Sequence, residues 1–169
     1  MRQAMYRVIG TCAVVAVVIG TLGVAVSKYF AAAKYFDSPV TVVSRAAIGF
    51  PDETTVTAEI ADSPQERATG LSEHVYLHED HGMLFLLDAP SQPSFWMKDM
   101  KFPIDIVWIS GETVVDMDEN VQGPGSGVKD SELPKVLPEV LVDKVLEVNA
   151  GFVAAHGISK GDHLDIRLP

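Results

Sequence analysis

One stretch of the chain, residues 82–110, constrains the fold most, because short apolar runs there alternate with single charges and turn residues. Its sequence is GMLFLLDAPSQPSFWMKDMKFPIDIVWIS. A brief apolar run bounded by Pro, Ser or a charged residue is typical of a β-strand. An ionised side chain inside such a run must find a partner, face solvent or line a polar pocket. This stretch therefore predicts a β-rich fold, with any functional site built around its charges.

The same pattern continues over most of the chain after residue 51. In residues 54–60, Val56, Ala58 and Ile60 alternate with polar residues, as in a half-buried strand. Short strands are expected at residues 54–60, 83–87, 94–98, 103–109, 113–117, 144–149 and 163–168. Many short strands with turn residues between them predict a mainly β domain, an antiparallel sandwich or a partly open barrel.

Two short helices interrupt the strands. Ser63 and Glu66 have the spacing of a capping box, with Pro at the first helical position, and predict a helix over residues 64–69 that ends at Gly70. Asn149 is placed to cap a second helix over residues 150–156, which Gly157 would end. Residues 119–143 are rich in Gly, Pro and Ser, and we expect either a mobile surface loop or a lid there.

An uncharged segment precedes this domain. Residues 8–26 contain no charged side chain and would span about 28 Å as a helix, close to the thickness of a bilayer core. Arg2 and Arg7 before the segment favour a cytoplasmic N-terminus. We expect a cytoplasmic segment at residues 1–7, a single transmembrane helix at 8–26, a tether at 27–51 and an extracytoplasmic β domain at 52–169. A signal peptide cleaved near residues 31–33 is the alternative.

Charge is divided along the chain. Residues 1–51 carry five Lys and Arg against one acidic residue, whereas residues 52–169 carry eight against twenty-two, a net charge of −14. So acidic a domain repels phosphate backbones, and we expect no nucleic-acid partner. The single cysteine, Cys12, lies in the predicted membrane span, so the domain has neither a disulfide nor a thiol catalyst.

Several separated motifs, in this order, resemble the family called domain of unknown function 192. They are ADSPQERATGL (61–71), HGMLF (81–85), SFWMKDM (94–100), FPIDIVWI (102–109), VLEVNAG (145–151) and KGD (160–162). The resemblance implies a compact, mostly β, sandwich-like domain, often exported or membrane-anchored, with no established activity. The family pattern maps onto the charged residues Arg67, Lys98, Asp105 and Glu147, while Ser72 and the pair Asp99-Met100 depart from it.

The lone charges are the candidate site residues. A binding module would use Trp96, or alternatively Trp108, as an apolar platform, with Arg67, Lys98, Asp105 and Glu147 orienting a polar ligand. The ligand would be a small polar molecule or an envelope partner, such as a saccharide or a peptide. A purely structural alternative pairs Arg67 or Lys98 with Asp105 or Glu147 in a half-buried ion pair.

Two further functions remain open at this point. A hydrolase-type enzyme would use Asp105 and Glu147 as general acid and base, although we expect the neighbouring cations to keep both carboxyls ionised. A copper-handling site would combine the soft ligands Met97 and Met100 with His81. No nucleophile elbow, phosphate loop or zinc cysteine pair is present, so we expect no cofactor and favour binding over catalysis.

Overall fold

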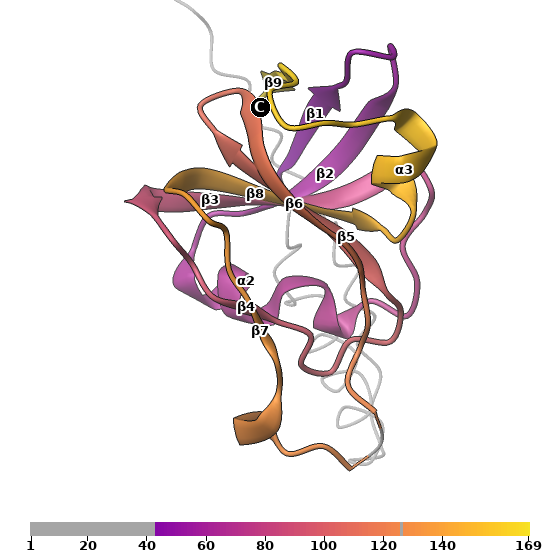
Figure 1. Ribbon diagram of the computed structural model, residues 1–169, viewed down its shortest axis with the longest axis vertical. Coiled ribbons are helices and arrows are strands. Elements are labelled where there is room, and N and C mark those ends of the chain that lie inside the picture. Colours follow the sequence, from indigo (N-terminus) through magenta and orange to yellow (C-terminus); the bar gives the residue numbers. More distant parts are fainter. Residues whose placement is uncertain (1–42, 126) are drawn as a thin grey trace, which may run out of the picture. The chain divides into compact units, whose positions relative to one another are not determined.

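The computed structural model describes residues 43–125 and 127–169, so the membrane span predicted at residues 8–26 lies outside the described part of the chain. Among the described residues, no helix has the length and apolar character needed to cross a membrane. One seven-stranded sheet dominates the domain, in the order β6-β5-β8-β3-β2-β1-β9 (Figure 1). Its strands are β1 (Arg45–Gly49), β2 (Thr55–Ala61), β3 (His81–Ser91), β5 (Ile104–Ser110), β6 (Thr113–Val121), β8 (Val142–Asn149) and β9 (Asp165–Arg167).

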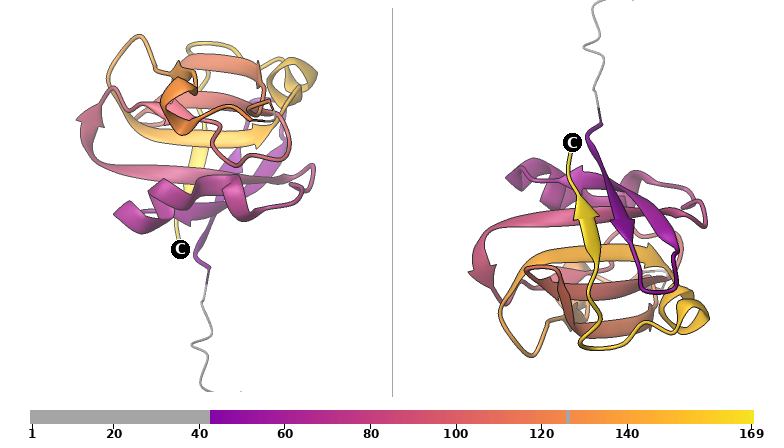
Figure 2. Two further views of the ribbon diagram at one scale, coloured as in Figure 1. Left: turned by 90° about the horizontal axis from the view of Figure 1, so that it is seen from below. Right: turned by 90° about the horizontal axis from the view of Figure 1, so that it is seen from above.

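The sheet curls into a half-barrel, because the C-terminal segment links its two edges. Gly161 and Leu164 donate backbone hydrogen bonds to Val114 and Glu112 at the start of β6. The chain then continues into β9, which pairs with β1 at the opposite edge (Figure 2). Of the two predicted architectures, the partly open barrel is therefore the one that forms. The expectation of a wholly antiparallel sheet is wrong at one place, since β2 and β3 are parallel.

The two faces of the sheet carry separate hydrophobic clusters. One cluster gathers side chains from most strands of the sheet and from α3 (Phe152–His156). The cluster on the opposite face includes Phe85, Ile106 and Trp108, and it lies under α2 (Pro64–Thr69), η2 (Gly70–Glu73), β4 (Phe95–Trp96) and β7 (Lys135–Val136). Figure 1 shows α2, β4 and β7 together on one side of the main sheet. A cavity lies on this second face.

The capping box predicted for α2 is confirmed. The Ser63 hydroxyl accepts a hydrogen bond from the Glu66 backbone N–H at 3.2 Å, and the Glu66 carboxylate accepts one from the Ser63 N–H at 3.0 Å. This reciprocal pair satisfies two of the N–H groups that the first turn of a helix leaves free. The helix ends at Gly70, as predicted.

The N-terminal cap of α3 differs from the prediction. The helix begins after Gly151, which has the left-handed φ of 87°, and the Asn149 side chain does not cap it. The Asn149 amide instead donates to the carbonyls of Leu77 and His78, at 3.2 and 2.8 Å. Gly157 ends the helix in the left-handed conformation, as expected.

Two boundaries predicted from the sequence are wrong. The tether was expected to reach residue 51, yet β1 lies within residues 27–51, pairs with β2 and β9, and buries Ile48 completely. The predicted loop at residues 119–143 contains the end of β6, the short helix η3 (Asp130–Glu132) and β7. Because β7 pairs with β4, part of this segment belongs to the cover over the second face.

Candidate functional site

A cavity of about 230 Å³ lies between α2 and the sheet face that α2 covers, with β4 beside it. Trp96 lies at its edge, with 48% of its surface exposed. Most of the lining is apolar or aromatic, and only two lining residues carry ionisable side chains, Arg67 and Glu147. The full lining is Arg67, Ala68, Thr69, Gly70, Leu71, Phe85, Leu87, Pro93, Ser94, Phe95, Trp96, Met100 and Glu147. A cleft lined by apolar and aromatic side chains that also presents polar groups is typical of a small-ligand site.

Glu147 is the buried acidic group of this cavity. It lies in the middle of the sheet on β8, opposite Met83 of β3 and Ile106 of β5. Directly opposed residues of antiparallel strands share a face, so the carboxyl stands among apolar side chains. Burial raises the pKa of Glu147 to about 8, and no described residue forms a hydrogen bond that offsets this effect. With a pKa above 7, the Glu147 carboxyl is mainly protonated at neutral pH, and in that form it can both donate and accept a hydrogen bond.

The predicted ionised state of Glu147 is accordingly wrong. Lys98 is paired with Asp130, and Arg67, although it lines the same cavity, is paired with Asp88 and forms no hydrogen bond to the Glu147 carboxyl, so burial is the cause that raises the pKa of Glu147. A buried carboxyl at a pKa near neutral is a feature that recurs at functional sites.

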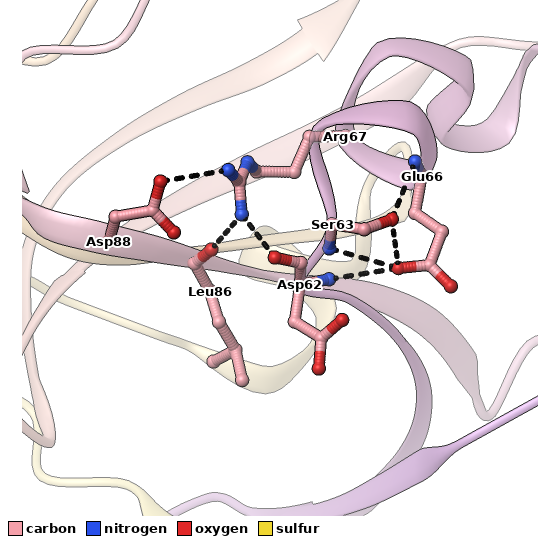
Figure 3. Close-up of polar contacts among 6 residues, drawn as sticks. All are labelled: Asp62, Ser63, Glu66, Arg67, Leu86 and Asp88. Carbon is pink, nitrogen blue, oxygen red and sulfur yellow. Dashed lines mark hydrogen bonds and ion pairs between the residues drawn. The ribbon is translucent and has the colours of Figure 1, made fainter.

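Arg67 anchors α2 to the sheet (Figure 3). Its guanidinium donates to the carbonyl of Leu86 at 3.0 Å and to that of Asp62, and it forms an ion pair with Asp88 at 3.2 Å. The planar guanidinium has several donors in fixed directions, which suits it to tie three groups together. Arg67 thus holds one wall of the cavity in place while lining it.

Lys98 does not reach the cavity. Its ammonium group pairs with the Asp130 carboxylate on η3, and this contact raises the pKa of Lys98. Both partners are exposed. An exposed ion pair of this kind contributes little to stability.

Asp105 has a structural role inside the other face of the sheet. Its side chain is fully buried. One carboxylate oxygen accepts the backbone N–H of Val153 at 2.9 Å, in the first turn of α3, and the other accepts the N–H of Asn120 at 2.7 Å. Asp105 therefore caps α3 across the fold and holds Asn120 in a left-handed turn, with φ of 52°.

Of the five predicted site residues, the structure brings together Arg67, Trp96 and Glu147, while Lys98 and Asp105 lie elsewhere. The structural alternative, an ion pair of Arg67 or Lys98 with Asp105 or Glu147, is wrong about the acidic partners. Arg67 pairs with Asp88, and Lys98 pairs with Asp130. Trp108, the alternative platform, is fully buried, and its indole N–H donates to Asp118 at 2.7 Å.

The predicted copper set is not assembled. Met97 packs in the buried cluster beneath β4, whereas Met100 lines the cavity beside Trp96. His81 lies at the start of β3, where its ring is hydrogen-bonded to Asp80. These three side chains therefore do not form a common ligand shell among the described residues.

Several lining residues were missed, notably Phe85, Leu87, Phe95 and Gly70. The local sequence around each of them is typical of a core position or a turn, because the cavity forms only where α2, η2, β3, β4 and β8 meet. The one local signal is Gly70, which adopts a φ of 51°, in the region that favours glycine, where α2 ends beside the cavity.

The geometry can be set beside known proteins. The family model described as Uncharacterized ACR, domain of unknown function 192, matches residues 47–166. The chain belongs to the domain of unknown function 192 family. The matched residues run from β1 into β9 and so include nearly all of the half-barrel and every residue that lines the cavity. The predicted resemblance is confirmed, and the family itself is uncharacterised.

Solved structures share this fold. One, from Sinorhizobium meliloti 1021 and proposed to be a transcription regulator, is 29% identical, with a TM-score of 0.62 over 73% of this chain and 92% of that one. Another, a protein of unknown function from Novosphingobium aromaticivorans DSM 12444, is 24% identical, with a TM-score of 0.62 over 76% of this chain and 89% of that one. No curated protein matches the chain significantly.

Proposed function

We propose that this member of the domain of unknown function 192 family is a binding module whose cavity beside Trp96 accepts a small ligand or one group of a larger envelope partner. The observation that carries the proposal is Glu147, a carboxyl only 6% exposed that meets no compensating hydrogen bond from the described residues. The Glu147 oxygens are not among the solvent-inaccessible atoms that lack a partner, so they keep access to the cavity, but their partial desolvation still costs free energy. A ligand that hydrogen-bonds this carboxyl would recover that cost.

The chemistry of the cavity defines the ligand class. A protonated Glu147 offers one O–H donor and an acceptor oxygen, which suits a neutral hydroxyl, amide or carbonyl group. Arg67, Thr69 and Ser94 are the other polar side chains of the lining. The rest is aromatic and aliphatic, and the Phe85 and Phe95 rings pack edge to face with centroids 4.9 Å apart. The exposed face of Trp96 fits the apolar side of a sugar ring or a peptide side chain. A neutral saccharide or peptide group of the cell envelope satisfies both requirements.

Acid/base hydrolysis by Asp105 and Glu147 is not proposed. Glu147 is the one carboxyl that lines this cavity among the described residues, and Asp105 is occupied by two backbone N–H groups. A general acid needs a second positioned group to activate water or the substrate. The cavity supplies binding contacts without that second group.

Protein-observed NMR tests the binding proposal. We expect N-acetylated oligosaccharides and short neutral peptides to shift the Trp96 indole signal and the Gly70 amide signal, and Trp96→Ala to abolish saturable shifts. Tyr76→Ala is the matched control, since Tyr76 is another exposed aromatic residue, outside this cavity. Shifts confined to other surfaces, or equal loss in the Tyr76→Ala variant, would contradict the proposal.

We also propose that the domain is held outside the cytoplasm by a transmembrane helix at residues 8–26. The support is the uncharged span, its length and the basic residues before it. Protease added to intact cells should then remove the β domain. Protection in intact cells, with cleavage only after lysis, would contradict this topology.

The Sinorhizobium meliloti protein is proposed to be a transcription regulator, but the charge of the present domain disfavours a nucleic-acid partner. The net charge of −14 over residues 52–169 repels a phosphate backbone. We therefore propose no nucleic-acid partner.

A further inference from the structure

A second group of side chains lies at the start of β3, where a tight turn brings three potential metal ligands together. The Nδ1 atoms of His78 and His81 lie 2.6 and 2.7 Å from the same carboxylate oxygen of Asp80. One ligand atom from each of the three residues lies within 4.8 Å of the others. Two imidazoles and one carboxylate are the ligand types that first-row transition metals prefer.

The backbone of this turn is fixed by the rest of the fold. The Asn149 amide at the end of β8 donates to the carbonyls of Leu77 and His78. The Thr57 N–H of β2 donates to the Asp80 carbonyl at 2.9 Å. The three side chains therefore project from a backbone held by two strands, which lowers the entropic cost of assembling a ligand set.

A pocket of about 450 Å³ adjoins the turn and offers further ligands. His78 and His81 line it together with Glu59, Glu73 and His74. The His74 Nε2 atom lies 3.4 Å from a Glu59 carboxylate oxygen. The His74 Nδ1 atom is inaccessible to solvent and has no hydrogen-bond partner in the described part of the chain.

We propose that His78, Asp80 and His81 form a binding site for a divalent first-row transition-metal ion of the Zn²⁺ type. In a tetrahedral site with bonds of about 2.1 Å, ligand atoms lie about 3.4 Å apart, so the two existing contacts need to open by less than about 1 Å. Rotation of the exposed His78 and Asp80 side chains supplies this movement. Three protein ligands leave a position for water or for a ligand in the adjoining pocket. This site is distinct from the cavity beside Trp96, and neither proposal depends on the other.

Calorimetric titration of the tag-free full-length protein with Zn²⁺ tests the site. We expect one ion per chain, and binding weakened about 10-fold or more in Asp80→Ala and in His81→Ala. Co²⁺ should give the visible absorption of a low-symmetry four-coordinate site. His163→Ala is the matched control, because His163 also faces a carboxylate, that of Glu112, is exposed, and does not line the pocket beside His78 and His81.

Two results would overturn the proposal. One is the absence of saturable Zn²⁺ binding by the unaltered protein. The other is binding that persists unchanged in the double variant His78→Ala/His81→Ala. NMR of the unaltered protein gives a reading that does not depend on variants folding, since Zn²⁺ should shift the imidazole signals of His78 and His81 and leave that of His163 unchanged. Equal shifts at all three rings would also contradict the proposal.

Discussion

Asp105 and Glu147 lie on adjacent strands of one sheet, but their side chains occupy opposite faces. Asp105 is directly opposite Val148 across β5 and β8, and Glu147, the residue before Val148, points the other way. The Asp105 carboxylate accepts two backbone N–H groups, whereas Glu147 faces a cavity and receives none. Two similar residues thus have different roles, one holding the fold together and the other available to a ligand.

The raised pKa of Glu147 makes stability depend on pH. Between its ordinary pKa of 4.5 and its folded value of about 8, the folded state holds a proton that the unfolded state has lost. The free energy of unfolding should therefore fall as pH rises, by about 4 kcal/mol between pH 4.5 and pH 8 from this group alone. The Glu147→Gln variant should lack this pH dependence of the free energy of unfolding, because a glutamine side chain does not titrate in this range.

We expect Glu147→Gln to match the unaltered protein near pH 4.5 and to exceed its stability progressively toward pH 8. Denaturant unfolding at several pH values measures the difference. Glu119→Gln, a change at an exposed carboxyl at the end of β6, serves as the control. A stability difference between Glu147→Gln and the unaltered protein that stays constant with pH would show that Glu147 is already ionised in the folded protein.

Loss of the Asp105 carboxylate should be strongly destabilising. Asp105→Ala leaves the N–H groups of Val153 and Asn120 without acceptors, and each hydrogen bond to an ionised group is worth about 1.5–3 kcal/mol. We expect a loss of about 3–5 kcal/mol in unfolding experiments, with faster hydrogen exchange at Val153. Asp165→Ala, at an exposed aspartate of β9, should change little. Comparable losses in the two variants would contradict a capping role for Asp105.

Arg67 and Lys98 should differ in their effect on stability. Arg67→Lys cannot reproduce the hydrogen bonds to Asp62, Leu86 and Asp88 together, and we expect a loss of about 1–3 kcal/mol. Lys98→Met should leave the melting temperature nearly unchanged, because its partner Asp130 is exposed. A large drop in melting temperature for Lys98→Met would mean that Lys98 neutralises a buried carboxylate instead.

Gly82 should tolerate no side chain. A Cβ at this position would lie 2.7 Å from the backbone oxygen of Glu147 and 3.2 Å from a Val56 methyl group, so β3 would have to move away from β8. We expect Gly82→Ala to cost about 1–3 kcal/mol in unfolding experiments. Gly125→Ala, where nothing lies within 4 Å of the added Cβ, is the control. Equal stability of the two variants would contradict this packing.

Local patterns in the sequence predicted the elements well. The capping box at Ser63 and Glu66, the alternation in β2 and the Gly157 stop each depend on residues a few positions apart. The mainly β class follows from the number of such strands. The motifs of residues 61–71 and 94–100 also identified the family, because motif order is a property of the sequence itself.

The pairing of strands and of charged side chains that lie far apart in the sequence could not be predicted from such local patterns. The strand β1 looked like part of a tether, and its place in the sheet depends on β2 and β9, the latter more than one hundred residues away. The parallel pairing of β2 with β3 depends on the path through α2 and η2. The partners of Lys98 and Arg67 likewise come from distant segments, η3 and β3.

The sequence alone determined which residues are charged within apolar runs, and hence which few positions were candidates for a site. The tertiary structure decided which of them share a face, which are capped by backbone N–H groups and which remain free. The physical reason is that a pleated strand turns successive side chains to opposite faces, while strand order and register decide what each face meets. Asp105 consequently meets the first turn of α3, and Glu147 meets the cavity beside Trp96.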